Sequence, residues 1–378
     1  MAWMTSRQRL LAALNRDKPD RLPATTHHLM PYFLQTYMGS MTELQFFDHF
    51  GLDAIRWTFP VEAKQALGQQ EQDGYIVTDT WRLEWEPIPD REYVTRRYRI
   101  TTPRGVLTGV LQSNQYTTWV REYPIKEKRD IDLLADFMPP IYCDVGTVNS
   151  EARAFGERGI VRGSIIGFQI FGQPGCWQDA ACLVGTERLI MATFDDPGWV
   201  HELLRILQRH KRVYIQSLEG AMYDVLELGG GDASTTVISP KIFDRFVAPY
   251  DRDLIALAHE VGQRIVYHTC GGMMPILERI ADMGPDAMET FTPPDMGGDV
   301  DLAAAKRRIG HRVCMIGGFD QFHYLIGCTP QETRAAVRRC FEAAGEGGGY
   351  ILCPSDHFFD ADPDLIRAFA EEARSCTY

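Results

Sequence analysis

Four residues in the carboxyl-terminal half of the chain have side chains of the kinds that bind zinc in proteins. His268 and Cys270 are separated by one residue, Glu289 follows after one predicted helix, and Cys353 comes after two further strand–helix units. Imidazole nitrogens, thiolate sulfurs and carboxylate oxygens are the donors that Zn²⁺ selects. We therefore predict that His268, Cys270, Glu289 and Cys353 bind one tetrahedral Zn²⁺ ion.

Each of these residues also has a simpler explanation on its own. Cys353 follows an apolar run and could be a core thiol, Glu289 could be a solvated carboxylate, and His268 could be a catalytic or core histidine. The combination of residue types favours a metal. The fourth ligand position stays open between Glu289, water, Asp232 and Asp320.

The predicted ligands indicate a class of chemistry. Two thiolates and one carboxylate place three negative charges around Zn²⁺, which makes the ion a poor Lewis acid for activating water. The same excess of charge keeps electron density on a further sulfur ligand, so that this sulfur stays nucleophilic. The site therefore favours alkyl transfer to or from sulfur, or activation of another soft nucleophile, over hydrolysis.

Elements of strand character recur along the chain and would position these residues. Most of the eight predicted core strands are followed by a helix, which predicts an α/β fold, namely a (β/α)8 TIM barrel. A doubly wound sheet is the alternative, but no Gly-x-Gly-x-x-Gly follows an early strand. The predicted strands lie near residues 22–27, 53–58, 160–166, 224–228, 264–269, 286–290, 313–317 and 349–353.

Residues 73–125 interrupt this regular pattern. The segment is rich in β-branched and aromatic residues, with a turn signal at residues 102–105, and we expect an antiparallel N-terminal β-hairpin insertion. Its aromatic side chains could cover a substrate pocket or simply pack the insertion onto the body. We expect residues 1–378 to form a single barrel domain that carries this insertion.

Helix-capping signals mark several helix starts. Thr5-x-x-Gln8 and Ser40-x-x-Glu43 are candidate capping boxes, and Ser239-Pro240 places a serine cap before a proline in the first turn.

Polar residues follow the predicted strands at the end where barrels carry their active sites. We expect these residues to orient the substrate or to move a proton. The candidates are His27, His28, Asp232, Asp356 and His357.

Composition limits the class of protein. The 378 residues include no apolar stretch of 18 or more, and the net charge of -12 argues against nucleic acid or an anionic membrane as a main partner. No secretory signal is visible, and nine cysteines at irregular spacing are expected to be reduced thiols. We expect a cytoplasmic enzyme, with a homodimer as an open expectation.

Five segments resemble blocks of the uroporphyrinogen decarboxylase-like superfamily, whose fold is a (β/α)8 barrel. True decarboxylases of this group carry an arginine-rich substrate signature near the first strand, whereas residues 24–30 here contain no arginine. A tetra-anionic porphyrinogen needs cationic clamps, so this departure weakens the decarboxylase interpretation. The resembling segments are residues 5–23, 239–250, 268–271, 316–320 and 347–355.

Another branch of the superfamily, the corrinoid-linked methyltransferases, has a zinc pattern of His-x-Cys followed much later by Cys. His268, Cys270 and Cys353 match that pattern. Cobalamin-independent methionine synthase, on the same barrel, adds a glutamate, and Glu289 resembles it. The resemblance implies a zinc-dependent methyltransferase that works with a corrinoid (cobalamin) on a partner protein.

Such an enzyme would exchange a methyl group between the corrinoid protein and a small methyl donor or acceptor. The candidates for that small molecule are a thiol, tetrahydrofolate and an aryl methyl ether, the last by O-demethylation. The alternative is a metal-free decarboxylase acting on a small carboxylate, with His268 and Asp232 as acid and base. A third hypothesis is a non-enzymatic barrel that serves as a scaffold for a corrinoid partner.

Overall fold

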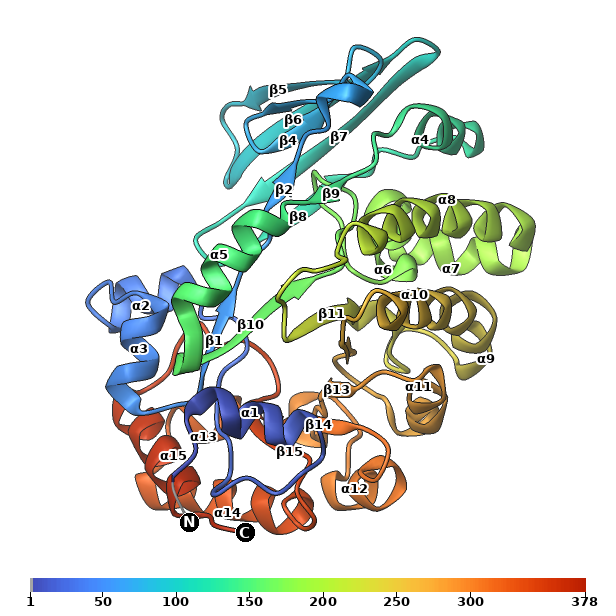
Figure 1. The fold of residues 1–378 in the computed structure, drawn as a ribbon. Coiled ribbons are helices and arrows are strands. Elements are labelled where there is room, and N and C mark those ends of the chain that lie inside the picture. Colours follow the sequence, from blue (N-terminus) through green and yellow to red (C-terminus); the bar gives the residue numbers. More distant parts are fainter. Residues whose placement is uncertain (1–2) are drawn as a thin grey trace.

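A computed structural model describes residues 3–378 of the protein. Its centre is a curled sheet of seven parallel strands, an α/β arrangement consistent with a TIM-like barrel (Figure 1). The strands, in spatial order, are β1 (Ala54–Trp57), β10 (Gly159–Ser164), β11 (Val225–Gly229), β12 (Ile265–His268), β13 (Ala287–Thr290), β14 (Cys314–Phe319) and β15 (Tyr350–Pro354).

The first predicted strand, near residues 22–27, is reduced to a single bridge between the two edge strands. Thr25 N donates to Leu352 O at 3.0 Å and Leu352 N donates to Pro23 O at 2.9 Å, while Asp53 N donates to Ala24 O at 2.7 Å. The chain at residues 23–25 therefore contacts both β15 and the start of β1, but it pairs over too short a length to form a full strand.

Alternation along the strands explains which side chains face the interior of the curled sheet. Successive residues of a strand point to opposite faces, and every second residue joins one apolar cluster. That cluster also takes in Leu10, Ala13 and Leu14 of helix α1 (Ser6–Leu14). Helix α1 thus packs against the inward-facing side chains. The strand residues of this cluster are Ile55, Ile160, Val225, Val266, Ala287, Cys314, Ile316, Ile351 and Cys353.

Ion pairs hold α1 in this position. Arg7 makes a two-pronged contact with Asp224 at 2.6 and 2.7 Å, and Arg9 pairs with Asp53 at 2.6 Å and with Asp20 at 2.7 Å. Asp224 and Asp53 each lie just before a strand of the sheet. The arginines of the opening helix are therefore tied to the starts of β11 and β1.

Helices connect the strands and cover the outside of the sheet (Figure 1). Several of them directly adjoin short 3₁₀ or π segments, and the longest is α8. The helices are α2 (Pro31–Tyr37), α3 (Glu43–Phe50), α4 (Ile131–Phe137), α5 (Val145–Phe155), α6 (Cys176–Val184), α7 (Thr186–Asp195), α8 (Pro197–Gln216), α9 (Pro240–Ile242), α10 (Ala248–Glu260), α11 (Leu277–Met283), α12 (Leu302–Ile309), α13 (Gln321–Tyr324), α14 (Pro330–Ala344) and α15 (Pro363–Ser375).

The segment expected to be a hairpin is larger than a hairpin. It contains a four-stranded antiparallel sheet, at the top of Figure 1, because residues before and after the predicted turn add two outer strands. Residues 102–105 do form the turn between its two long central strands. The four strands are β5 (Arg82–Ile88), β6 (Val94–Thr102), β7 (Gly105–Ser113) and β8 (Thr118–Glu122).

Two smaller antiparallel pairs flank this sheet. β3 (Gln70–Gln72) pairs with β4 (Tyr75–Val77), and β2 (Val61–Glu62) pairs with β9 (Tyr142–Cys143). The β2–β9 pair joins the two ends of the chain segment that carries the four-stranded sheet.

Two of the three predicted helix starts are confirmed. Thr5 forms a capping box with Gln8, and the Ser239 hydroxyl accepts from Ile242 N. The predicted box at Ser40 is wrong, because the cap is Thr42, which forms its box with Gln45. Within residues 3–378, no helix combines the length and the apolar character needed to cross a bilayer.

Candidate active site

Charged side chains replace apolar ones near the ends of four neighbouring strands. Arg162, Glu227, His268 and Glu289 each stand two residues after an apolar residue that belongs to the interior cluster, so they face the same interior. In the sheet register His268 lies beside Gly229 on one neighbouring strand and beside Glu289 on the other. The strand alternation therefore brings four polar groups together at the carboxyl ends of the strands, where barrel enzymes place their chemistry.

The contacts among these groups are short. His268 Nδ1 lies 2.9 Å from Glu289 Oε1, and Arg162 Nη2 donates to the same oxygen at 2.5 Å and to Glu227 Oε2 at 2.7 Å. His27, just after the bridge at residue 24, places its Nε2 3.4 Å from Glu289 Oε1 and 3.7 Å from Glu227 Oε2. All five side chains thus form one continuous network.

Burial and charge act against each other in this network. Burial alone would raise the pKa of Glu289, but Arg162, His27 and His268 hold it well below its ordinary value. Glu227 likewise has a pKa lowered to about 2, because His268 and His27 outweigh burial. Both carboxylates are therefore ionised at neutral pH.

The two histidines respond to these carboxylates. Burial would lower the pKa of His268, but Glu227, Cys270 and Glu289 raise it well above its ordinary value. The pKa of His27 is also raised, because Glu289 and Glu227 outweigh burial. The two carboxylates thus favour the protonated, positively charged form of both histidines.

The donor set fits a divalent metal ion. One ligand atom from each of His27, Glu227, His268 and Glu289 lies within 4.8 Å of the others. In the part of the chain that the structure describes, the buried atoms Glu289 Oε2 and His27 Nδ1 have no hydrogen-bond partner, although buried polar atoms almost always have one. Two imidazoles and two carboxylates are ligands that zinc and other first-row divalent ions accept.

This cluster contains two of the four predicted zinc ligands, His268 and Glu289. Cys270 is half-buried just after β12, and its thiol is near enough to affect the pKa of His268. Cys353 is buried on β15 within the apolar interior cluster, and burial raises the pKa of its thiol strongly. Neither cysteine belongs to the group of donor atoms that come together, so their ligation stays a prediction.

Three of the predicted catalytic residues lie beside the cluster. The His28 ring stacks on Trp57 at 3.8 Å between centroids, and the His357 ring lies 5.4 Å from that of His27. Asp356 Oδ1 accepts from His357 N at 2.7 Å. Burial, followed by the charge of His27, lowers the pKa of His28 to about 3, so this imidazole is neutral.

Two other predicted residues are engaged elsewhere. The Asp232 carboxylate accepts from the Thr186 hydroxyl at 2.8 Å, and its backbone carbonyl accepts from Trp177. Asp320 caps α13, accepting from His323 N at 3.1 Å. These contacts give both acidic residues a part in holding loops, and neither carboxylate is among the four donor groups that come together.

Sequence reasoning missed Arg162 and Glu227. The signal was present, because both are charged residues at alternating positions of strands that are otherwise apolar. A charge on the inward face of a buried strand needs a partner of opposite charge. Arg162 and Glu227 could therefore have been predicted to pair with each other.

A cavity of about 420 Å³ lies beside the cluster. Its lining includes His28, Trp57 and Glu227, together with residues 164–174 at the end of β10 and in the loop that leads to α6. Glu227 therefore belongs both to the donor cluster and to the cavity. A small molecule in the cavity would meet the cluster at this residue.

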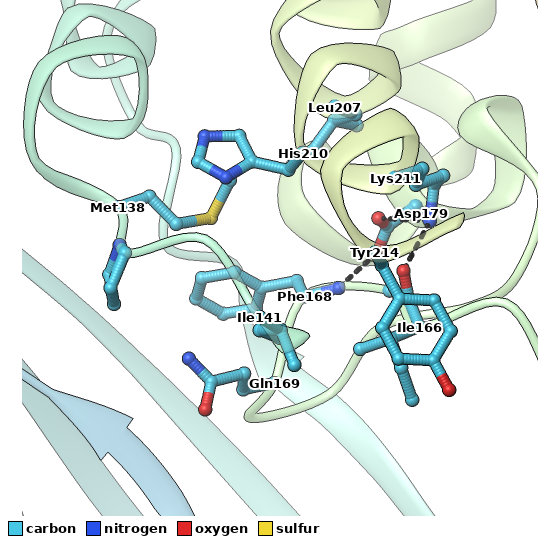
Figure 2. Close-up of a pocket in the computed structure, with 12 residues that line it drawn as sticks. Met138, Ile141, Ile166, Phe168, Gln169, Asp179, Leu207, His210, Lys211 and Tyr214 are labelled. Carbon is cyan, nitrogen blue, oxygen red and sulfur yellow. Dashed lines mark hydrogen bonds and ion pairs between the residues drawn. The ribbon is translucent and has the colours of Figure 1, made fainter. Parts of the chain in front are cut away.

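A buried ion pair holds that loop from behind, next to a second, small cavity shown in Figure 2. Lys211 on α8 pairs with Asp179 on α6 at 2.9 Å and also donates to the carbonyls of Ile166 and Gln173. Asp179 accepts from Phe168 N and Gln173 N at 2.9 and 3.2 Å. The pair therefore fixes four backbone groups of the loop.

Comparison with known proteins gives a family and a fold. The family model described as Uroporphyrinogen decarboxylase (URO-D) matches residues 160–376. A uroporphyrinogen decarboxylase of Thioalkalivibrio sulfidiphilus is 28% identical over 189 residues, covering 47% of this chain and 49% of the relative. That of Chlorobaculum tepidum is 25% identical over 263 residues, covering 66% of this chain and 69% of the relative.

The chain thus spans about half to two thirds of the length of these curated relatives. A solved methyltransferase from Methanosarcina mazei has a TM-score of 0.64 at 16% identity, covering 98% of this chain and 99% of that one. At this identity the likeness is one of fold. It extends over nearly the whole chain, including residues before 160.

Proposed function

Because the chain belongs to the uroporphyrinogen decarboxylase (URO-D) family, we propose that it is a metal-dependent methyltransferase within that family. It would pass a methyl group from a small methylated substrate to a corrinoid carried by a partner protein. The metal would be zinc, held by His27, Glu227, His268 and Glu289. Cys270, beside His268, is the thiol nearest in sequence to this set.

One observation carries the proposal, namely the buried group of two imidazoles and two carboxylates with uncommitted donor atoms. When both imidazoles are neutral, as metal ligands must be, the two glutamates and Arg162 leave this interior with one excess negative charge, which a bound cation would compensate. A bound divalent ion would act as a Lewis acid that polarises the heteroatom carrying the methyl group. This donor set has fewer negative charges than the thiolate-rich set predicted from sequence, and it favours activation of a methyl donor.

The residues of the chain have separate tasks in this proposal. Arg162 bridges Glu227 and Glu289 and so holds both carboxylates in place. Its guanidinium also lies 4.3 Å from the centroid of the Trp57 ring, which fixes its plane. His28 and His357, beside His27, are the residues placed to orient a substrate that enters from the cavity.

The cavity argues against a polyanionic porphyrinogen as substrate. None of the described residues that line it is a lysine or an arginine. Arg162 is the nearest interior cation, and it is already shared by two carboxylates. The substrate carboxylates would therefore have no cationic partners, which makes their burial costly.

Decarboxylation of a small carboxylate is the second candidate. It is favoured by the curated relatives, whose names are those of uroporphyrinogen decarboxylases, and by the presence of Arg162 in the interior. In that case His268 would act without a metal as the acid that protonates the carbon left by CO₂.

The test is a spectroscopic assay for methylation of free cob(I)alamin, with zinc-loaded protein and a panel of small methyl ethers and methyl thioethers. We expect turnover that falls at least about a hundredfold in Glu289→Gln and His268→Ala, because removing a metal ligand or its close partner has effects of this size or larger. His323→Asn, on the exposed helix α13, is the matched control. Release of CO₂ from a small carboxylate by metal-free protein, with no cobalamin methylation, would contradict the proposal.

A further inference from the structure

The cavity beside the cluster has a wall of aromatic rings that leads from its mouth to the donor residues. The rings of His28 and Trp57 stack at 3.8 Å, and Trp57 and Phe59 stack at 5.8 Å between centroids. Phe59 is 45% exposed at the outer end of this row. A flat ring that slides along the row would keep aromatic contacts over its whole path, in the range of 4.5–7 Å in which such pairs are favourable.

The charges around the cavity select against ions. Glu227 is the one charged side chain among the described residues that line it, and Arg162 already pairs with Glu227 at 2.7 Å. Arg162 is itself only 2% exposed, so its guanidinium is not available to a ligand carboxylate. An anion would be buried beside Glu227 without a free cationic partner, whereas an organic cation would find the Glu227 carboxylate already paired with Arg162 and close to His27.

The size of the cavity limits the ligand further. A volume of about 420 Å³ is near the lower end of the range of about 300–1,000 Å³ that is usual for ligand sites. The loop of residues 164–174, which also lines the cavity, is held by Lys211 and Asp179, so it cannot easily retreat to admit a larger molecule. The cavity suits a molecule of one or two rings.

From these three observations we propose that the substrate is an uncharged, planar aromatic molecule that binds along the His28–Trp57–Phe59 row. The substituent that reacts points inward, toward Glu227 and the donor cluster. The orientation of the reacting substituent rests on the proposed function, whereas the selection of a neutral ring by the cavity does not.

Binding of four probes to the full-length protein tests this inference, with dissociation constants from ligand-observed NMR titration at neutral pH. The probes are anisole, which is neutral and flat; benzoate, which is flat and anionic; benzylammonium, which is flat and cationic; and methoxycyclohexane, which is neutral and not flat. We expect anisole to bind about tenfold or more tightly than each of the other three. Equal or tighter binding of benzoate would overturn the inference.

A pair of variants locates the binding. Phe59→Ala should weaken anisole about fivefold, which corresponds to the loss of one aromatic contact, whereas Phe322→Ala, which removes another half-exposed phenylalanine on α13, should change nothing. If neither variant changes anisole binding, the ligand does not lie on the row. A backbone amide NMR spectrum of each variant shows whether that variant is folded.

The outcomes for function and for substrate class are separable. Selective anisole binding by zinc-free protein, with no cobalamin methylation by zinc-loaded protein, would retain the substrate class and reject the proposed function. Methylation of cobalamin from methoxycyclohexane as readily as from anisole would retain the function and reject the substrate class.

Discussion

Breaking the buried ion pair between Lys211 and Asp179 should destabilise this protein more than breaking any of its described surface pairs. Both side chains are almost fully buried, at 1% and 2% exposed. Lys211→Met keeps the aliphatic stem but removes the charge and three contacts, with the Asp179 carboxylate and the Ile166 and Gln173 carbonyls. Asp179 would then keep only its two backbone N–H donors.

The expected cost follows from what is left unpaired. Removing one partner of a buried ion pair costs about 3–5 kcal/mol, because the other charge stays buried without compensation. Asp179→Asn should cost a similar amount, since it leaves the Lys211 ammonium with carbonyl partners alone. The double variant Lys211→Met/Asp179→Asn removes both charges, so its cost should fall short of the sum of the two single costs by about 2–3 kcal/mol.

Urea unfolding at neutral pH measures these free energies, and Lys128→Met is the control. Lys128 pairs with Asp196 on the surface, at 61% and 38% exposed, and a pair of this kind is worth about 0–1 kcal/mol. Because the loop held by Lys211 forms one wall of the cavity, Lys211→Met should also weaken anisole binding. A cost below about 1 kcal/mol for Lys211→Met, or strict additivity in the double variant, would refute this reasoning.

Three further predictions concern single positions. Burial and the neighbouring Arg209 and Lys211 lower the pKa of His210 to about 4, so the unfolded state takes up a proton first as the pH falls. The neutral, buried imidazole of His210 therefore contributes stability above about pH 6.5, and this contribution is lost toward pH 4. Between pH 7 and 5, the free energy of unfolding of His210→Leu, measured by urea unfolding, should therefore fall by about 1–2 kcal/mol less than that of the parent. An unchanged acid dependence would contradict this. Gly109→Ala should destabilise the protein by about 1–3 kcal/mol, because a Cβ would lie 2.3 Å from Tyr98 Oη in the antiparallel sheet; thermal unfolding checks this, and an unaltered midpoint would show that the tyrosine moves aside. Cys353→Ala should keep its zinc, measured by elemental analysis, because Cys353 is outside the donor cluster; loss of zinc would instead support the ligand set predicted from sequence.

Local patterns predicted much of the fold. Strands at seven of the eight predicted places are present, because short apolar runs bounded by turn residues are reliable signals for buried parallel strands. The segment near residues 22–27 is less apolar, with Pro23 and two threonines, and it pairs through one bridge only. Its extent depends on how far the edge strands β1 and β15 approach each other, which no local pattern encodes.

The site was predictable in part. His268 and Glu289 could be placed together because they end neighbouring strands, and their register is fixed by the alternation of apolar residues. Cys353 has the same inward direction, but whether its sulfur reaches the donors depends on the stagger and curvature of the sheet. Arg162 and Glu227 stand outside any metal-ligand spacing in the sequence, and only the rule that a charge on an apolar strand needs a partner predicts them.

The most direct test of the metal site is anomalous X-ray diffraction at the zinc edge from crystals of the zinc-loaded protein. We predict one strong peak among the side chains of His27, Glu227, His268 and Glu289, and no peak at this place in Glu289→Gln. An anomalous peak between Cys270 and Cys353 would contradict this zinc site. So would a zinc-loaded protein with no peak at the carboxyl ends of these strands.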